Sequence, residues 1–355
     1  MSKIIKIVYL WEILSENNKY LIEALCKKNC RVTVITRNKQ KKKFFFLPKL
    51  RSKRFKIFPF EKFDFFRLLK FLKNKSPDIV VVCGWFSACY LIFCLYFRLK
   101  TTQVVLICDN VWLNTFGQKI IKFLRIFKIN YFFFSKVWIP GPPSLSFVKN
   151  IGFKEKDILM HFHAANTKMF SKNYGKNLLI KKKKYPKKFL FVGRFVEKKG
   201  LKTLIDAWKN LKNKKGWHLH IIGSGDINIS VKNIEAISIS KFLEHNKLVE
   251  LLKNIGCFVC PSYLEEWGIV VQEFASAGMP LILSDGVLSK DYFLINGKNG
   301  FLFESGNVDS LKNSLKKIIN LPSNKLLQMS ILSHQLSKKI SPKQSAESLL
   351  SILKV

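Results

Sequence analysis

The sequence predicts an α/β protein with two consecutive parallel sheets, each covered by helices on both faces (a doubly wound arrangement). Short β-branched or aromatic runs alternate with longer amphipathic segments along the chain, as in strands that are joined by crossover helices. The alternation pauses at the lysine run of residues 181–184, at Tyr185 and at Pro186, and then starts again. A charge run before a proline is typical of a linker, and 355 residues exceed one ordinary core. We therefore expect two domains with a ligand cleft between them.

The first half contains short runs with strand character, at residues 3–10, 31–36, 55–59, 79–83, 103–108 and 137–140. Amphipathic stretches between them predict helices at residues 17–28, 63–73, 86–100 and 116–128. A further helix begins at residues 141–143 and carries Phe147. Residues 79–97 carry no charge and are long enough to span a bilayer. Gly84 breaks this stretch after its β-branched part, so we interpret it as a strand and a buried helix rather than a membrane span.

The second half repeats the pattern. Its strands are predicted at residues 189–192, 218–222, 257–260 and 281–284, and its helices at residues 200–211, 247–254 and 269–277. A last helix, at about residues 342–353, follows another linker and is expected to pack back on the first domain. We therefore predict an N-terminal domain at residues 1–180, a C-terminal ligand-binding domain at residues 181–335, and a C-terminal helix within residues 336–355.

The composition is that of a basic globular protein. Hydrophobic residues make up 48% and charged residues 24%, which excludes a disordered chain. The formal net charge is +39, and two interpretations are compatible with it. A coding bias would raise Lys, Phe, Ile and Asn together, and attraction to a polyanion or an anionic membrane surface would use the same charge.

The cysteines and the first residues indicate a cytoplasmic protein. Most of the 8 cysteines lie in apolar runs, where a thiol behaves as a small hydrophobic group. Cys257 and Cys260 form a C-x-x-C, but strand alternation places them on opposite faces, and no histidine or second pair completes a zinc site. Lys3 and Lys6 accompany only a short apolar run, which is not a secretory pattern. We expect reduced cysteines and a cytoplasmic location.

Residues 261–280 are the strongest indication of function. A strand ends at Pro261, and Gly268 lets the backbone turn into the next helix. Glu265 lies in the loop and Glu273 in the helix, in a chain with only 23 acidic residues. A helix amino terminus at the carboxyl edge of a sheet favours an anion. The alternative is a capped amphipathic helix with Glu273 on its solvated face.

Two further strand ends carry candidate ligands for phosphate. One strand ends at Gly193, and Arg194 and Lys199 follow it before the next helix. Arginine as a fork and lysine as a point charge suit a diphosphate, although any single cation is weak evidence among 62 Lys and Arg residues. In residues 221–225, Gly223 lets a ring or a phosphate approach the backbone. Such a glycine can equally be part of a simple turn.

Together, these residues resemble the retaining glycosyltransferases of family 4. The resemblance rests on three motifs: G-R-F-V-E-K-K-G at 193–200, I-I-G-S-G at 221–225 and P-S-Y-L-E-E-W-G-I-V-V-Q-E-F-A-S-A-G-M-P at 261–280. It continues through residues 296–302 and Asp309, so that it covers about residues 189–320 well. In the first half only the strand–helix order and residues 162–170 fit. The resemblance implies the GT-B fold, with two facing Rossmann-like domains and a nucleotide-sugar donor bound to the second.

The resemblance also implies catalytic roles for the matching charged residues. Arg194 and Lys199 would hold the donor diphosphate and stabilise it as the leaving group. Glu265 would contact the transferred sugar near its reacting carbon. Glycosyl transfer develops negative charge on the departing diphosphate and positive charge on the sugar, so cations at one end and a carboxylate at the other are complementary to it.

The remaining contacts that the resemblance implies are with the nucleoside, the phosphates and the sugar. Glu273 would accept hydrogen bonds from the ribose hydroxyls. The amides at the helix start would meet phosphate or sugar, and the loop at residues 241–243 would flank the base. The other predicted donor-binding residues are Gly193, Gly223, Gly268, Ile269 and Val270.

The first half departs from the family pattern in two places. Many relatives have a glycine-rich loop after the first strand, whereas residues 11–17 contain no glycine. Many also have a histidine where Asp109 stands, so Asp109 is a candidate catalytic residue, the alternative being a helix cap or a loop acid. His161 and His163 are interpreted as structural. No Asp-x-Asp occurs in the chain, so neither a metal nor another cofactor is expected.

The first domain is expected to choose the acceptor. Residues 116–128 place apolar side chains on one face, flanked by Lys119, Lys122, Arg125 and Lys128. A basic amphipathic surface of this kind suits anionic headgroups. A core-facing helix with a solvated basic face is the alternative. If this surface binds lipid, the acceptor is expected to be a lipid-linked glycan.

We therefore predict a metal-independent, hexosyltransferase-type enzyme at the inner face of the cytoplasmic membrane. It would move a sugar, with retention, from a UDP- or GDP-sugar to a growing cell-surface glycan such as lipopolysaccharide, capsule or O-antigen. The main alternative is a basic nucleic-acid-binding protein, which explains the charge but not Glu265 and Glu273. A nucleotide-sugar epimerase is a third interpretation, which would not need Arg194 and Lys199.

Overall fold

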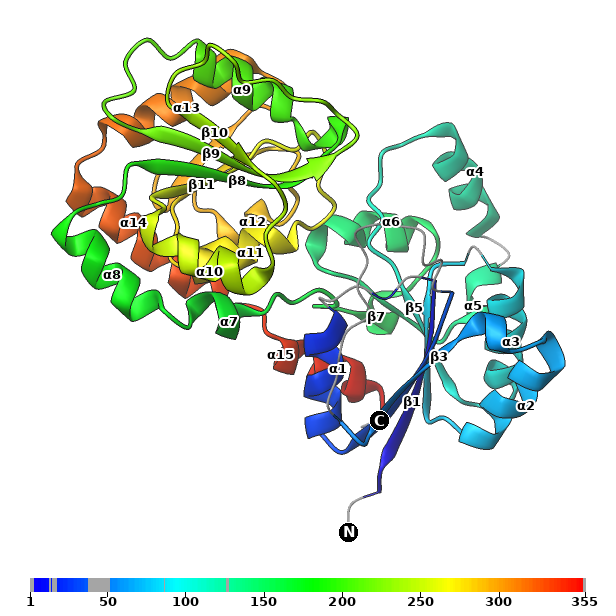
Figure 1. Ribbon diagram of the computed structural model, residues 1–355. Coiled ribbons are helices and arrows are strands. Elements are labelled where there is room, and N and C mark those ends of the chain that lie inside the picture. Colours follow the sequence, from blue (N-terminus) through cyan, green and yellow to red (C-terminus); the bar gives the residue numbers. More distant parts are fainter. Residues whose placement is uncertain are drawn as a thin grey trace. The chain divides into compact units, whose positions relative to one another are not determined.

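The computed structural model describes residues 3–12, 14, 18–37, 52–85, 87–125 and 128–353. The chain divides into two compact units (Figure 1): unit 1 is Met1–Ala164 with Ile340–Val355, and unit 2 is Ala165–Lys339. The described residues of each unit form one parallel sheet with helices around it. The α/β class with two doubly wound sheets that the sequence predicts is therefore confirmed.

The described residues of unit 1 form a seven-stranded sheet in the order β3-β2-β1-β4-β5-β6-β7. Its strands are β1 Ile5–Trp11, β2 Cys30–Thr36, β3 Phe55–Pro59, β4 Ile79–Cys83, β5 Gln103–Ile107, β6 Lys136–Trp138 and β7 Ile158–Leu159. The strand order turns back between β1 and β4. In parallel sheets, ligands bind beyond the carboxyl ends of the strands at such a switch point.

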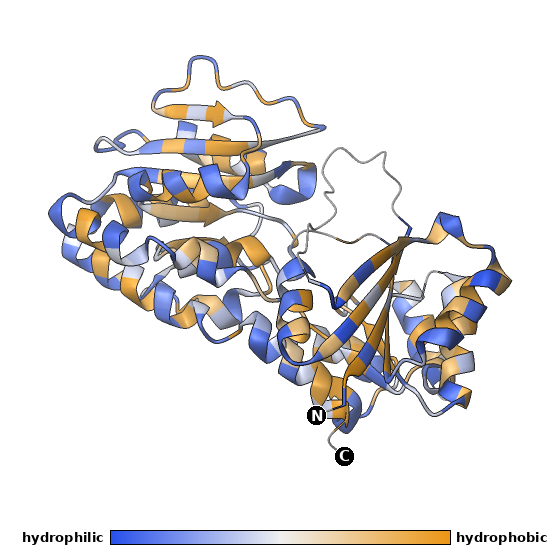
Figure 2. Ribbon diagram, turned by 60° about the horizontal axis from the view of Figure 1, so that its bottom comes forward, coloured by the Kyte–Doolittle hydropathy of each residue, from blue (hydrophilic) through white to orange (hydrophobic). Residues whose placement is uncertain are grey.

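Both faces of the central strand β4 are buried, which explains why its sequence is continuously apolar. Val80 and Val82 of β4 belong to the core cluster on the side of α2 (Phe65–Lys75) and α3 (Ala88–Leu99). Val81 points to the other side and packs in the cluster that contains the apolar residues of α1 (Asn18–Lys27). In Figure 2 most residues of the strands of this sheet are hydrophobic (orange), whereas its helices carry both hydrophobic and hydrophilic residues.

The uncharged residues 79–97 form β4 and α3. Ser87 begins α3 as its N-cap, because its Oγ accepts the amide of Tyr90 at 3.4 Å. Among the described residues, no helix has both the length and the apolar character needed to cross a membrane. The other helices of unit 1 are α4 Phe116–Leu124, α5 Ile129–Phe133, α6 Leu145–Asn150 and α15 Pro342–Leu350.

The last helix, α15, completes unit 1 although it follows unit 2 in the sequence. It packs against α1, and Lys28 Nζ lies 2.8 Å from Glu347 Oε1 between them. Leu349 enters the core cluster beneath α1. Ser348 Oγ donates to the carbonyl of Met160 at 2.7 Å. The C-terminal helix is thus held by apolar, ionic and hydrogen-bonding contacts of unit 1.

The described residues of unit 2 form a six-stranded sheet in the order β10-β9-β8-β11-β12-β13. Its strands are β8 Lys188–Phe195, β9 His218–Gly225, β10 Ile237–Ser240, β11 Cys257–Cys260, β12 Leu281–Ser284 and β13 Gly300–Phe303. Its helices are α7 Thr167–Ser171, α8 Tyr174–Lys183, α9 Leu201–Lys209, α10 His245–Leu251, α11 Ile269–Ser276, α12 Lys290–Phe293, α13 Val308–Asn320 and α14 Ser323–Ser337. The switch point of this sheet lies between β8 and β11.

Four strands have the predicted bounds, namely β3, β4, β11 and β12. Of these, β11 and β12 are fully buried, β4 is buried in all but its last residue, and the edge strand β3 is partly exposed. The prediction did not include the short strands β7, β10 and β13, nor the helices α5, α7, α8, α12, α13 and α14. The helix predicted at residues 116–128 corresponds to α4, which ends at Leu124.

The lysine run at residues 181–184 is not a linker. It ends α8, and Lys181 is 2% exposed because it reaches into the core of unit 2. Lys181 Nζ donates to the carbonyl of Gly278 at 2.6 Å, at the end of α11. Tyr185 Oη donates to the carbonyl of Gly256 at 2.8 Å. The charge run predicted a solvated segment. This prediction is wrong because tertiary contacts bury one of its lysines, Lys181.

The division between the units differs from the predicted boundaries because helices next to those boundaries pack within unit 2. Unit 2 begins at Ala165, rather than after residue 180, because α7 and α8 pack on α11 and α14. Unit 1 resumes at Ile340 rather than at residue 336, because α14 continues to Ser337.

Burial lowers the pKa of Lys181 from 10.5 to about 7. Between these two values, the unfolded chain binds a proton that the folded chain does not. The free energy of unfolding therefore rises with pH through this window, as neutral Lys181 in the fold replaces the charged amine that burial penalises.

We expect the free energy of unfolding of the wild type to rise, relative to that of Lys181→Met, between pH 7 and pH 8.5. The slope should approach about 1.4 kcal/mol per pH unit, because methionine has no proton to lose. Urea denaturation followed by tryptophan fluorescence at several pH values measures it. Lys182→Met is the control, since Lys182 is exposed on the same helix. A difference between wild type and Lys181→Met that does not change with pH would contradict the neutral state of the amine.

Candidate functional site

The candidate site of unit 2 lies at the carboxyl ends of β8 and β9. These neighbouring strands pair in parallel, with Gly193 opposite Gly223 and Arg194 opposite Ser224. The sheet therefore brings Gly193, Arg194 and Gly223 to one edge, as the sequence predicts. The Arg194 side chain is exposed there, so its guanidinium is accessible to a ligand.

Gly223 allows a close approach of two backbones at this edge. Its φ is +156°, and an added Cβ would lie 1.9 Å from the carbonyl oxygen of Gly193. No other residue fits this position without moving a strand. The sequence left open whether Gly223 belongs to a simple turn, and the structure shows that it lies within β9, near its carboxyl end, where it pairs with β8.

A second close approach joins the loops after β8 and β11. Gly200 has a φ of +64°, and an added Cβ would lie 1.9 Å from the carbonyl oxygen of Pro261. The amide of Tyr263 donates to the carbonyl of Lys198 at 2.8 Å. These contacts place the residue between them, Lys199, beside the loop that carries Glu265.

Lys199 and Glu265 form an ion pair at this edge. Lys199 Nζ contacts Glu265 Oε2, and each side chain is 15% exposed. Ser262 Oγ donates to the same carboxylate oxygen at 3.3 Å. The sequence placed the lysine with the phosphates and the glutamate with the sugar, and the structure brings the two into direct contact. Prediction from the sequence missed Ser262, whose only signal is its place directly after Pro261 at a strand end.

The backbone of Glu265 is fixed from the loop after β12. Its amide donates to the carbonyl of Gly286 at 2.9 Å, and its carbonyl accepts the amide of Leu288 at 3.0 Å. Gly268 then makes room for the side chain, since an added Cβ there would lie 2.9 Å from Glu265 Cγ. The carboxylate is thereby held over the start of α11.

The amino terminus of α11 contributes backbone amides. Gly268 is the N-cap, with φ +74°, and no described side chain caps the helix start. The amides of Ile269 and Val270 therefore belong to a helix end that favours an anion. Both lie next to Glu265, in the positions that the sequence predicts for donor contacts.

Glu273 lies in the second turn of α11 and is 5% exposed. It is therefore not on a solvated face, which was the simpler interpretation of the sequence. Carboxylates are rarely buried unless a charged or hydrogen-bonding group meets them. Burial close to an open strand edge is compatible with binding ligand hydroxyls.

The loop after β10 adds an aromatic ring at the same edge. Residues 241–243 directly follow β10, which pairs in parallel with β9. Phe242 is 54% exposed. An exposed ring at this position can stack on a planar base. The sequence resemblance implies that this loop flanks the base, and Phe242 is the residue of the loop that could do so.

Asp109 belongs to unit 1, where it follows β5. Its side chain is 55% exposed, and its Oδ2 lies 3.8 Å from Nε2 of His163. The sequence has no histidine directly after β5, and His163 was expected to be a structural residue. The structure brings His163 there from the segment after β7, because β6 and β7 follow β5 in the sheet order. This neighbour was not predictable without the order of the strands.

The described residues contain no group of three or more His, Cys, Asp or Glu side chains that could hold a metal ion. The eight cysteines are free. The described groups at the edge of unit 2 that could meet a diphosphate include the cations Arg194 and Lys199 and the amides that begin α11.

Comparison with known proteins relates the sequence of this chain to glycosyltransferases. Residues 177–338 match the family described as "Glycosyl transferases group 1". The chain is 26% identical over 239 residues to the amylovoran biosynthesis glycosyltransferase AmsD of Erwinia amylovora, which covers 65% of this chain and 61% of AmsD. It is 25% identical over 240 residues to the N,N'-diacetylbacillosaminyl-diphospho-undecaprenol alpha-1,3-N-acetylgalactosaminyltransferase of Campylobacter jejuni, covering 62% of each. The chain thus matches about three fifths of the length of these relatives.

Solved structures match almost the whole chain. Anabaena Alr3699/HepE in complex with UDP has a TM-score of 0.72 at 13% identity, covering 99% of this chain and 100% of that protein. The lipopolysaccharide outer core galactosyltransferase WaaB has a TM-score of 0.67 at 18% identity, covering 99% of both. A glycosyltransferase of Rickettsia africae has a TM-score of 0.73 at 16% identity, covering 99% of this chain and 98% of that protein. At such identities the likeness shows the fold.

The GT-B fold that the sequence resemblance implies is therefore confirmed for the chain. The family match covers most of unit 2, which holds Arg194, Lys199, Glu265 and Glu273. Most of unit 2 thus matches the glycosyl transferases group 1 family, within a chain that has the GT-B fold.

Proposed function

We propose that this protein is a glycosyltransferase that moves a sugar from a UDP- or GDP-sugar to a growing cell-surface glycan. The observation that carries the proposal is the contact of Lys199 with Glu265, at the sheet edge that also holds Arg194. Positive groups and a carboxylate stand side by side where donor phosphates and sugar would meet. Placement in family 4, and with it retention at the sugar carbon, rests on the sequence motifs.

Each residue would have a distinct role in the reaction. The bond between the sugar carbon and the diphosphate breaks, and its electron pair leaves with the nucleoside diphosphate. Arg194 and Lys199 would stabilise the charge that develops there, without a metal. Glu265 would stabilise the positive sugar. An acceptor hydroxyl forms the new bond to the sugar carbon and gives its proton to the departing diphosphate. Glu273 would hold the ribose, and Asp109 would be the catalytic carboxylate of unit 1.

The named relatives support a glycan acceptor. One is named for the biosynthesis of amylovoran, a second for transfer to a diphospho-undecaprenol-linked sugar, and a third for the lipopolysaccharide outer core. The Anabaena protein of the same fold was solved with UDP. A lipopolysaccharide, capsule or O-antigen glycan on a lipid carrier fits these names, and a hexose is the simplest sugar to test first.

We expect UDP or GDP to raise the melting temperature of the protein and Glu273→Ala to abolish that shift, because the ribose hydroxyls lose their acceptor. A nucleotide at 100 times its Kd adds about 2.7 kcal/mol to the free energy of unfolding. A thermal-shift assay with a panel of nucleoside diphosphates measures it. Glu250→Ala is the control, since Glu250 is an exposed carboxylate of α10. Tight DNA binding without any nucleotide response would instead favour the nucleic-acid-binding alternative.

Lys199→Met should lower turnover by at least about 100-fold, because one charge-stabilising donor is lost where the leaving group departs. Release of nucleoside diphosphate from the donor selected by the thermal-shift panel is the measurement, and Glu265→Gln should also lose activity. Lys198→Met is a matched control, because Lys198 Nζ lies 3.6 Å from Glu266 Oε2 on the exposed side of the loop. Equal losses in the two lysine variants would argue against a specific role for Lys199.

Association with the cytoplasmic face of an anionic membrane is part of this proposal. Large apolar residues of α4 are exposed, among them Phe116 at 79% and Phe123 at 68%. Lys119 and Lys122 are exposed on the same helix. The alternative of a core-facing helix does not fit this exposure, whereas an interfacial helix does.

The protein should sediment with anionic but not with neutral liposomes at low salt, since screening weakens the attraction of its cations. Phe116→Ser with Phe123→Ser should reduce the sedimented fraction, because the apolar anchor is lost. Leu179→Ser is the control, as Leu179 is 64% exposed on α8 of unit 2. Binding that is indifferent to lipid charge would refute the membrane part of the proposal.

A further inference from the structure

A large cavity opens in unit 1 at the edge of the sheet opposite to Asp109. Its volume is about 770 Å³, within the range of ligand pockets, roughly 300–1,000 Å³. Gln103, the first residue of β5, and Lys136, the first of β6, line it. Asp109 follows the other end of β5, about 20 Å away along the strand. The cavity is therefore separate from the proposed catalytic carboxylate of this unit.

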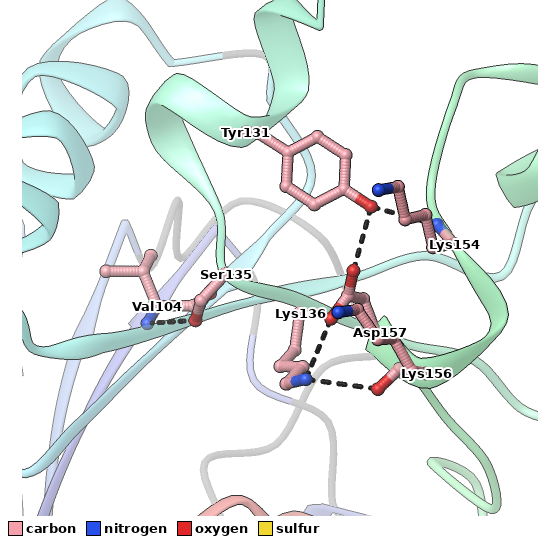
Figure 3. Close-up of polar contacts among 7 residues, drawn as sticks. All are labelled: Val104, Tyr131, Ser135, Lys136, Lys154, Lys156 and Asp157. Carbon is pink, nitrogen blue, oxygen red and sulfur yellow. Dashed lines mark hydrogen bonds and ion pairs between the residues drawn. The ribbon is translucent and has the colours of Figure 1, made fainter.

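The lining of this cavity is strongly basic, and we call it the basic pocket. Among its described lining residues, Asp157 is the single carboxylate. Lys136 Nζ lies 2.8 Å from Asp157, and Tyr131 Oη donates to it at 2.9 Å (Figure 3). Lys149 is paired with Glu155 at 3.5 Å. The other cations of the lining form no ion pair within the described part of the chain: Arg98, Arg125, Lys128, Lys154 and Lys156.

The network around Asp157 fixes one wall of the basic pocket. Lys136 Nζ also donates to the carbonyl of Lys156 at 3.0 Å, and Tyr131 Oη accepts the amide of Lys154 at 2.9 Å. Burial alone would raise the pKa of Asp157, but hydrogen bonds from Lys136 and Tyr131 hold it below its usual value. The carboxylate therefore stays ionised and neutralises its own partner, while the charge of the remaining cations is left for a ligand.

Two buried donors near this pocket have no hydrogen-bond partner among the described residues. They are Arg98 Nε and Asn130 Nδ2. Buried polar groups are nearly always paired in proteins, because an unpaired one destabilises the fold. Arg98 lines the basic pocket, and Asn130 lines the cavity next to it. Oxygen atoms of a phosphate group in the basic pocket would suit the donor of Arg98.

The neighbouring cavity is apolar and has a volume of about 310 Å³. Its apolar lining consists of Trp85, Leu91, Ile121, Ile129, Phe133, Phe134 and Ile151. Arg125 lines both cavities. Gly152 lets the chain pass close to this arginine, since at φ +104° an added Cβ would lie 3.3 Å from Arg125 Cβ. A basic pocket and an apolar one thus share one lining residue, Arg125.

The helices beside these two cavities expose large apolar residues. On α3 these are Ile92 and Leu99, on α4 Phe123, and on α5 Ile129 and Phe132, with exposed fractions of 51%, 76%, 68%, 45% and 62%. The helices α3 and α5 pack against each other. Apolar side chains exposed next to basic ones favour a lipid over a nucleic acid or a free anion, neither of which would cover them.

We propose that the two cavities together bind one anionic lipid, with its phosphate in the basic pocket and part of its chain in the apolar cavity. The lipid would be a phosphate ester whose charge lies close to its hydrocarbon chain, so that both ends reach Arg125. This inference deepens the proposed membrane association by naming the headgroup chemistry and its site. It does not depend on the donor site of unit 2.

Isothermal titration calorimetry of the full chain with dihexanoyl phosphatidic acid, kept monomeric, tests the proposal. One molecule should bind per chain, at least about tenfold more tightly than dihexanoyl phosphatidylcholine, because charged hydrogen bonds are lost with the latter. Dibutyryl phosphatidic acid should bind about tenfold more weakly than the dihexanoyl lipid, since each buried methylene contributes about fourfold. Inorganic phosphate or a short single-stranded DNA that binds as tightly as the lipid would overturn the assignment.

Two double variants test whether the lipid binds to specific cations of the basic pocket or only to the net positive charge of the protein. Arg125→Gln with Lys154→Gln should weaken dihexanoyl phosphatidic acid binding by about tenfold or more. Lys62→Gln with Lys70→Gln removes the same charge from exposed positions, one before α2 and one on it, neither of which lines the basic pocket. This change should alter the Kd by less than about twofold. Equal weakening in both double variants would show that net charge alone binds the lipid, and would overturn the proposal.

A third variant tests the apolar cavity without touching its cations. Ile129→Gln should remove the difference between the dibutyryl and dihexanoyl lipids, because Ile129 lines the apolar cavity. Unchanged chain-length dependence would overturn the placement of the chain. All variants should keep the melting temperature and the nucleotide shift of the wild type, so that a failed lipid experiment and a failed glycosyltransferase proposal give different results.

Discussion

The candidate site depends on backbone segments that approach one another more closely than side chains would allow. Three glycines of unit 2 make these contacts, because an added Cβ would meet a carbonyl oxygen of a neighbouring loop or strand: Gly200 at Pro261, Gly223 at Gly193 and Gly286 at Tyr263. They bring together the loops that follow β8, β11 and β12. Lys199 and Glu265 meet because their loops are locked in this way, so the electrostatics of the site follow from backbone packing.

Much of this arrangement could be predicted from the sequence. Strands buried on both faces carry an uninterrupted apolar signal, and β11 and β12 were therefore predicted with their observed bounds. Because the carboxyl ends of parallel strands share one edge, motifs that follow such strands are expected to converge. Arg194, Lys199 and Glu265 all follow predicted strands. The structure places Arg194 at the carboxyl end of β8, and Lys199 and Glu265 on the loops of the same edge.

The parts that could not be predicted depend on tertiary contacts that leave no local pattern. Lys181 has the sequence surroundings of a solvated linker, and its burial depends on the carbonyl of Gly278, far along the chain. His163 reaches Asp109 only because of the order of β5, β6 and β7 in the sheet. The cations of the basic pocket come from separate helices and loops of unit 1. In a chain with 62 Lys and Arg residues, sequence alone does not distinguish a cation in a pocket from one in solvent.

The return of α15 to unit 1 has a consequence for how the protein is made. Unit 2 is one continuous stretch of chain, so all its strands and helices are available once that stretch has left the ribosome. Unit 1 is interrupted, and Ala346 and Leu349 of α15 are part of the core beneath α1. These residues are synthesised only after the whole of unit 2. The N-terminal unit, although translated first, therefore acquires its complete core last.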